Sequence, residues 1–164
     1  MVRGPTRRTT MSTTTTDRIT KEILLKAPRS RVWRALTDSK EFGTWFQSVF
    51  TEPFRPGTRL KGRITYPGYE HLKFELVIEK MEPERLFSFR WHPNAVDPNL
   101  DYSKEPMTLV EFTLQEVEGG TLLKLVESGF DAIPLARRAD ALKANEGGWT
   151  EQMVAIENYL RRNP

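Results

Sequence analysis

The feature that most constrains the fold is the C-terminal segment from Asp131 to Leu160. Apolar residues recur there at spacings of three, four and seven, which predicts one long amphipathic helix. Because shorter, strand-like segments dominate the rest of the chain, the apolar face of this helix must supply a large part of the interior. The predicted stripe consists of Leu135, Ala139, Leu142, Trp149, Met153, Ile156 and Leu160.

One position on this stripe carries a carboxylate, Glu146, and Gly147-Gly148-Trp149 follows it directly. A carboxylate desolvated among aromatic side chains can serve as a general acid or base. The alternative is a residue at the rim of a cavity that pairs with an arginine in solvent, and the neighbouring glycines favour this second reading. Both readings remain open from the sequence.

The segments before this helix alternate apolar and polar residues, as expected of strands that bury one face. Phe74, Leu76 and Ile78, for example, alternate with charged residues. Short breaks such as Gly119-Gly120 are turn sequences and make successive strands antiparallel neighbours. A sheet with a single apolar face must curl around the C-terminal helix, so the fold class is α+β. Strands are expected at 18–26, 49–52, 59–66, 72–81, 85–91, 107–117 and 121–128, with a short helix after Pro28 and another over 40–46.

The length of 164 residues fits one domain with a sizeable core, expected over residues 17–164. Residues 1–16 are rich in Thr and Arg and contain almost nothing to bury, so we expect a flexible tail there. Met11 is an alternative start of the chain. We see no internal repeat.

Composition excludes several function classes. The chain has no cysteine, which rules out disulfides, thiolate nucleophiles and iron–sulfur clusters. The net charge is only +3 and the basic residues are scattered, so nucleic-acid binding is not expected. No apolar stretch approaches the roughly 18 to 20 residues that span a bilayer, and no signal peptide is evident, so we expect a cytoplasmic protein without a membrane span.

The connection from His92 to Pro106 is longer than the turns elsewhere and contains three prolines. Loops of this length in compact domains often serve as lids or binding loops. An ordered surface excursion is the equally weighted alternative.

The order of one strand, two short helices, six strands and a long helix resembles the START-like, or Bet v 1-like (SRPBCC), superfamily with its helix-grip fold. The run Ala-Pro-Arg-Ser-Arg-Val-Trp-Arg-Ala-Leu-Thr-Asp at 27–38, followed by Trp45-Phe46, is similar to the opening of one branch. That branch is named after the activator of the heat-shock-protein-90 ATPase. The segments 110–114, 120–123, 127–130 and 145–149 agree with the same branch, and the resemblance covers about residues 18 to 160.

The resemblance implies a curved seven-stranded antiparallel sheet that grips the last helix, with a hydrophobic cavity between them. Members of the superfamily bind lipids, sterols and polyketides, and some catalyse cyclisation or hydration. The branch takes its name from a cochaperone in which this domain is only one part. The resemblance therefore implies the fold and its cavity, but it does not specify the ligand or the function.

Aromatic side chains are numerous enough to line a ligand site, although each of them also suits a packed core. The candidate ligand-binding residues are Trp45, Phe54, Tyr66, Phe74, Phe89, Trp91, Phe112, Phe130, Glu146, Trp149 and Met153.

Polar candidates for catalysis are few. Glu146, Tyr66 and His92 are the nominees, with Tyr102 beside them at the mouth of the cavity. His71 and His92 are the only histidines and are not spaced as a helical metal pair, so no metal site is expected. Motifs for a serine nucleophile, a phosphate loop or a dinucleotide are missing, so no cofactor is expected.

Three functional hypotheses follow. The first is binding of a small hydrophobic molecule, such as a lipid, polyketide or aromatic compound, in the cavity. The second is a non-covalent enzyme, cyclase-like or hydratase-like, that uses the same cavity, and the sequence favours binding over catalysis. The third is a cochaperone-like or stress-response module that binds a chaperone or another protein. The open edges of such a sheet also favour a homodimer.

Overall fold

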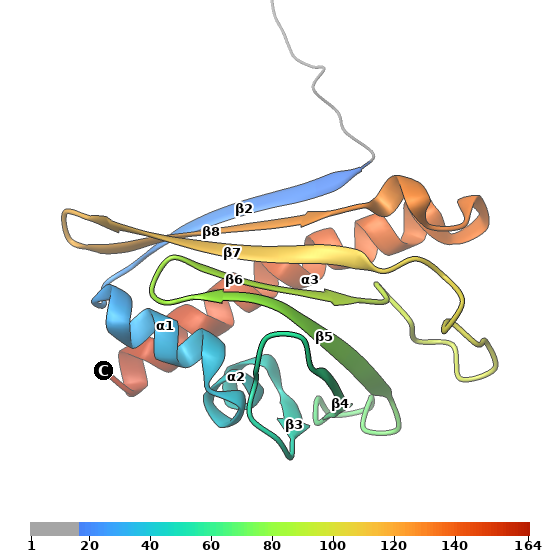
Figure 1. The fold of residues 1–164 in the computed structure, drawn as a ribbon, viewed down its shortest axis with the longest axis horizontal. Helices are drawn as coiled ribbons and strands as arrows, with labels where there is room; N and C mark the ends of the chain where they lie inside the picture. The colour runs from blue at the N-terminus through green and yellow to red at the C-terminus, as the bar shows by residue number, and fades with distance from the viewer. Residues whose placement is uncertain (1–16) are drawn as a thin grey trace, which may run out of the picture.

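The computed structural model describes residues 17–164, and the tail expected at 1–16 lies outside the described residues. These residues form a seven-stranded sheet, two short helices and one long helix (Figure 1). The α+β helix-grip architecture expected from the sequence is confirmed. In chain order the elements are β2 (Arg18–Leu25), α1 (Arg29–Thr37), α2 (Ser39–Phe46), β3 (Ser48–Phe50), β4 (Arg59–Ile64), β5 (Lys73–Glu82), β6 (Leu86–Trp91), β7 (Thr108–Val117), β8 (Gly120–Ser128), the 3-10 turn η1 (Phe130–Ala132) and α3 (Leu135–Arg162).

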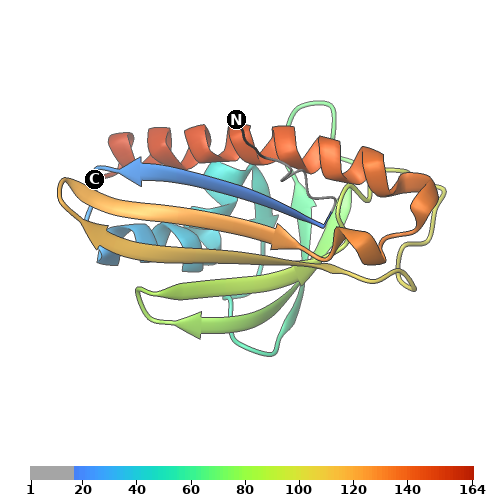
Figure 2. The same cartoon turned by 90° about the horizontal axis from the view of Figure 1, so that it is seen from above.

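The sheet has the strand order β2-β8-β7-β6-β5-β4-β3, and all neighbours are antiparallel. From β3 to β8 each strand therefore lies beside its neighbour in the chain. The exception is β2, which pairs along its whole length with β8, from Arg18 opposite Ser128 to Leu25 opposite Thr121. The sheet curves along one side of α3, and Figure 2 shows the helix lying alongside it, next to β2.

The hairpin between β7 and β8 illustrates why the turn sequences are placed where they are. Gly119 and Gly120 both have positive φ, 90° and 150°, a backbone conformation that other residues rarely adopt. A Cβ on Gly120 would also overlap the carbonyl oxygen of Leu25 on β2. Position 120 therefore requires glycine for two reasons, the backbone conformation of the turn and the close approach of β2 to β8.

The core lies between the concave face of the sheet and α3. The predicted alternation is confirmed, because Leu76, Ile78, Phe89 and Phe112 are fully buried on that face. On α3 the C-terminal half of the predicted stripe is confirmed as well. Its buried residues are Trp149, Met153, Ile156 and Leu160, and the helix continues through Gly147-Gly148 without a break.

The prediction is wrong for the first two residues of that stripe, whereas Leu142 is partly buried and packs against the core. Leu135 is 79% exposed and Ala139 is also exposed. The reason is visible in Figure 1, where the first turns of α3 extend past the ends of the strands and have no sheet to face. The inward-facing line instead runs through Ala141 and Asn145, so the polar residue on this face is Asn145 rather than its neighbour Glu146.

Helices α1 and α2 are joined at Asp38, whose carboxylate accepts hydrogen bonds from the backbone N–H groups of Lys40 and Glu41 at 2.9 and 3.0 Å. Asp38 thereby caps α2 at its N-terminus, a position where aspartate is strongly preferred. The cap orients the first turn of α2, and with it the side chain of Glu41.

Glu41 joins the three helices. Its carboxylate pairs with Arg31 at 2.8 Å and Arg34 at 2.7 Å, both on α1, and accepts a hydrogen bond of 2.8 Å from the Tyr159 hydroxyl on α3. We call these four residues the Glu41 cluster. Burial raises the pKa of the Glu41 carboxyl, but hydrogen bonds from the tyrosine and the two arginines outweigh it and hold the pKa below its ordinary 4.5. Burial, and then the bond to Glu41, raises the pKa of Tyr159 above its ordinary value.

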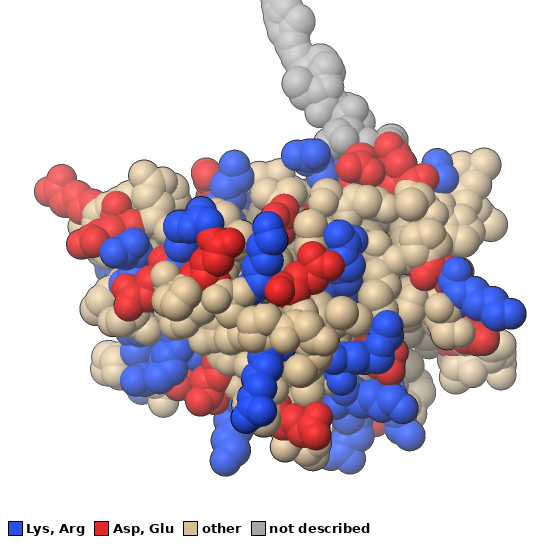
Figure 3. Space-filling model, viewed as in Figure 1, with Lys and Arg blue, Asp and Glu red and all other residues tan. Residues whose placement is uncertain are grey.

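The convex face of the sheet, seen in Figure 3, carries Lys and Arg interspersed with Asp and Glu. Cross-strand pairs such as Arg59 with Glu75, at 3.0 Å, account for part of this pattern. Among residues 17–164, no helix combines the length and the apolar character needed to cross a membrane.

Candidate functional site

A fully buried carboxylate, Glu127 on β8, lies between the sheet and α3. Its Oε1 accepts a hydrogen bond from Trp149 Nε1 at 2.7 Å, and its Oε2 accepts from Trp91 Nε1 at 2.8 Å and Thr108 Oγ1 at 2.6 Å. Asn145 Nδ2 donates to both oxygens, at 3.0 and 3.1 Å. We call these five residues the Glu127 cluster.

The cluster gathers side chains from three adjacent strands and the long helix. Trp91 ends β6 and Thr108 begins β7 directly opposite it, while Glu127 lies near the end of β8. Asn145 and Trp149 are one helical turn apart on α3, so both face the sheet. Each hydrogen bond to a charged group contributes roughly 1.5–3 kcal/mol, which offsets the cost of burying a carboxylate that no cation in the described part of the chain accompanies.

The two indoles in this cluster are stacked, with ring centroids 5.6 Å apart and planes inclined by 29°. Phe46 on α2 lies beside both rings, at 5.8 Å from Trp91 and 6.1 Å from Trp149. Since Glu127 accepts a hydrogen bond from each indole N–H group, it fixes the orientation of both rings. The exposed side of this arrangement is therefore a rigid aromatic surface.

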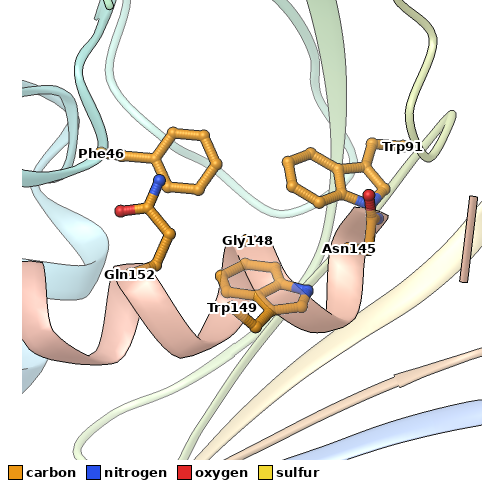
Figure 4. A pocket seen from close by; sticks show the side chains of 6 residues that line it. All are labelled: Phe46, Trp91, Asn145, Gly148, Trp149 and Gln152. Carbon is orange, nitrogen blue, oxygen red and sulfur yellow. The ribbon is translucent and has the colours of Figure 1, made fainter. Parts of the chain in front are cut away.

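That surface lines a hollow of about 180 Å³, which we call the first hollow (Figure 4). Trp91, Trp149 and Asn145 lie on one side of it, and Phe46 and Gln152 lie on the other. Glu127 itself is behind this lining and does not face the hollow. The complete lining is Phe46, Trp91, Asn145, Gly148, Trp149 and Gln152.

A second hollow, of about 220 Å³, adjoins the first and shares Phe46, Trp91 and Asn145 with it. Its remaining wall comes from the start of β5 and from the loop after β6. The other lining residues are Ile64, Leu72, Lys73, Phe74, His92, Asn94, Ala95 and Val96.

The loop from His92 to Pro106 is held against α3 by Arg137. The guanidinium donates to Glu105 Oε1 at 2.7 and 2.9 Å and to the carbonyl oxygen of Pro93 at 2.9 Å. It also lies 4.7 Å from the ring centroid of Tyr102. His92 Nε2 is 3.1 Å from the carbonyl oxygen of Glu105. The loop is thus a fixed wall of the second hollow, tied to the start of the helix.

The residues predicted to form the site are distributed over three environments, and whether any of them contacts a ligand stays a prediction. Six are packed inside the core, namely Trp45, Phe54, Phe89, Phe112, Phe130 and Met153. Four border the hollows, namely Phe74, Trp91, Trp149 and His92. Two lie on the surface, namely Tyr66 and Glu146.

The two surface residues have clear physical reasons for their positions. Strand β4 ends at Ile64, before Tyr66, so Tyr66 lies in the following turn, is 46% exposed and packs its ring against Tyr69 at 5.6 Å. Glu146 points away from the hollow, and its carboxylate pairs with Lys21 on β2 at 2.9 Å. It therefore matches the rim reading, with a lysine in place of the expected arginine.

Sequence reasoning missed the three polar members of the buried cluster, Glu127, Thr108 and Asn145. A signal was present for Glu127, because it continues the alternation of the buried Leu123 and Leu125 on β8. A charged residue in phase with buried apolar ones must find partners, and that rule points to the site. Asn145 could have been found from its spacing of four residues before Trp149.

Comparison with solved structures places this fold among bacterial proteins of the same architecture. Protein MLL2253 from Mesorhizobium loti superposes with a TM-score of 0.70 at 23% identity, over 90% of this chain and 98% of that one. DynU16, described as a putative protein in the dynemicin biosynthetic locus, gives 0.68 at 21% identity, over 88% of this chain and 47% of that one. No curated protein matches the sequence.

The solution structure of an Aha1 dimer from Colwellia psychrerythraea superposes with a TM-score of 0.65 at 16% identity, over 86% of this chain and 93% of that one. These identities establish likeness of fold alone. The family model described as Activator of Hsp90 ATPase homolog 1-like protein matches residues 26–161, which include α1, α2, all of α3 but its last residue, and the whole Glu127 cluster. With its helix-grip fold and this match over most of its length, the chain belongs to the family of Activator of Hsp90 ATPase homolog 1-like proteins.

Proposed function

We propose that this protein binds a small, flat, mainly apolar molecule in the two adjoining hollows between α2, α3 and the C-terminal end of strand β6. The observation that carries the proposal is the shared wall of Phe46, Trp91 and Asn145. Aromatic surfaces with a few fixed polar groups are typical of small-molecule sites.

The size of the hollows limits the ligand. Pockets for drug-sized molecules are roughly 300–1,000 Å³, and the hollows here measure about 180 and 220 Å³. A ligand of one or two rings fits the first hollow alone, and a larger one must extend past Trp91 into the second. Long acyl chains and steroids suit this space less well.

The neighbouring groups support binding rather than catalysis. Glu127 is buried behind the lining and both of its oxygens accept hydrogen bonds from side chains, so it does not contact a molecule in the hollow. Glu146 is exposed and paired with Lys21 on β2. The acidic groups closest to the hollow therefore hold the site together or face solvent.

Gly148 lines the first hollow although helix interiors disfavour glycine by about 1 kcal/mol relative to alanine. No atom lies within 4 Å of a Cβ built on Gly148, so packing does not require the glycine. Its lack of a side chain keeps the hollow open. The same holds for the space around Gly147, but Gly147 does not line the hollow.

This pair of glycines provides a matched test. Gly148→Leu places a side chain in the hollow, whereas Gly147→Leu makes the same change in helix propensity outside it. Indole serves as the probe, and the Nε1–H signals of Trp91 and Trp149 in a two-dimensional NMR titration report binding, with Trp33 as a remote reference. We expect the wild type and Gly147→Leu to bind indole and Gly148→Leu to lose at least tenfold in affinity.

Equal binding by the two leucine variants would remove the hollow as the site. Absence of any shift at Trp91 and Trp149 in the wild type, with indole and with a panel of other one-ring and two-ring compounds, would refute the proposed function.

A further inference from the structure

The chemistry of the first hollow is set by the direction in which Asn145 presents its amide. Asn145 belongs to both the buried cluster and the lining of the hollows. An asparagine amide has a donating and an accepting end, so fixing one end fixes the other.

Glu127 fixes the amide. Both carboxylate oxygens lie within 3.1 Å of Asn145 Nδ2, and the opposite orientation would place the amide oxygen against two carboxylate oxygens. The remaining partners of Glu127, two indole N–H groups and a threonine hydroxyl, all donate to it. The network therefore accepts only the nitrogen of Asn145, which assigns Oδ1 to the other side.

Asn145 Oδ1 receives no hydrogen bond from residues 17–164, and it is not sealed away from solvent. The indole N–H groups of Trp91 and Trp149 point to Glu127, so the rings offer only carbon edges and faces to the hollow. Gln152, the other amide in the lining, has no partner among the described residues that holds its orientation, so it adapts to either kind of ligand group.

We infer that the ligand of this site carries a hydrogen-bond donor, a hydroxyl or a ring N–H, which binds Asn145 Oδ1 while its ring packs against Phe46 and the two indoles. Phenol-like and indole-like molecules belong to this class, whereas fully apolar rings and rings with acceptors alone do not. The inference rests on the proposed function and specifies its ligand.

The test compares indole with 1-methylindole, which differs by the loss of the N–H donor and one added methyl group. Dissociation constants come from the NMR signals of Trp91 and Trp149. In the wild type we expect indole to bind about three- to tenfold more tightly, the range that one net hydrogen bond supplies. Asn145→Leu should abolish the preference, because it removes the acceptor and keeps a similar volume. Gln152→Leu, in the same lining, should retain the preference.

The outcomes separate the two proposals. Equal affinities for the two probes in the wild type would overturn the donor requirement and leave the hollow as a binding site. Loss of the preference in Gln152→Leu, with its retention in Asn145→Leu, would overturn the role of Asn145. Failure of both probes to shift the indole signals would remove the site itself. Since the wild-type comparison needs no substitution, it tests the donor requirement even if Asn145→Leu does not fold.

Discussion

The carboxylates of Glu41 and Glu127 each help to tie α3 to the rest of the molecule, and they do so by opposite means. Glu41 meets two arginines and a tyrosine at the partly exposed end of the helix, whereas Glu127 is fully buried among two indoles, a threonine and an amide. The first arrangement neutralises charge and joins three helices. The second leaves the charge with neutral donors only, and three of the four donor residues line the hollow.

The comparison of the two clusters shows that a buried carboxylate surrounded by neutral donors can orient several side chains at once. A cation beside Glu127 would compensate it more simply, but a single lysine or arginine would not orient three separate side chains. Neutral donors do so, because each must turn its N–H or O–H toward the carboxylate. The Glu41 cluster is therefore a structural tie, and the Glu127 cluster positions the surface of a site.

The largest effect is expected for Glu127→Gln. The substitution preserves shape but replaces an accepting oxygen with an NH₂ group, so donors face donors in a dry environment. Each buried donor left without a partner costs roughly 1–3 kcal/mol, and we expect a loss of about 3 kcal/mol in the free energy of unfolding. Urea denaturation measures it.

Glu146→Gln is the matched control, because it makes the same change on an exposed carboxylate of α3, which pairs with Lys21 on β2. Its expected effect is about 0.5 kcal/mol or less. Similar losses for the two variants would mean that the Glu127 network does not hold the helix to the sheet.

A smaller effect is expected for Glu41→Gln, about 1–2 kcal/mol at neutral pH, because the largely buried Arg31 loses its counter-ion while water still reaches the cluster. The folded-state pKa of Glu41 lies below its ordinary 4.5, so the folded protein keeps this carboxylate ionised where the unfolded chain takes up a proton. Its contribution is therefore present above about pH 4.5 and is lost as the pH falls through the folded-state pKa. Unfolding measured from pH 7 to pH 3 should show the gap between wild type and variant closing in acid. A gap that stays constant over this range would argue against the pKa shift.

Effects equal to or smaller than that of Glu41→Gln are expected from removing one neutral donor at each carboxylate. Thr108→Val deletes a buried hydroxyl that donates to Glu127, and Tyr159→Phe deletes a half-buried hydroxyl that donates to Glu41. We expect about 1–2 kcal/mol for the former and about 0.5–1 kcal/mol for the latter, since Glu41 keeps two cations. Thermal unfolding under identical conditions ranks them. The reverse ranking would show that neither the burial of the hydroxyl nor the absence of a cation beside its acceptor decides the strength of these bonds.

The fold could be predicted because its signals are local and repeated. Alternation along strands such as β5 and β7, the hairpin glycines and the long apolar stripe each specify an element, and together they leave one architecture. Strand ends were predicted less accurately, as at Tyr66, because pairing partners and not propensities decide where a strand stops.

The site was less predictable, because it depends on which of two adjacent helix positions faces inward. Asn145 and Glu146 differ by 100° around α3, and the stripe drawn through Leu135 selected the wrong one. Leu135 fits the apolar periodicity but is exposed, because the first turns of α3 extend beyond the sheet. Periodicity alone does not show which turns of a helix have a sheet to pack against. The hydrogen bonds of Glu127 come from residues far apart in the chain, and such partners are visible only once the strands are paired.

The pairing of β2 with β8 also has a consequence for how the chain is made. Arg18 can pair with Ser128 only after Ser128 has been synthesised. The backbone N–H and C=O groups of β2 therefore lack their β8 partners while all the other strands are being made. Contacts this distant in sequence slow folding and lengthen the time during which an unpaired strand can meet another chain. During synthesis, β2 stays unpaired until β8 has been made. Because β8 also carries Glu127, the sheet is completed and the buried carboxylate is added in the same step.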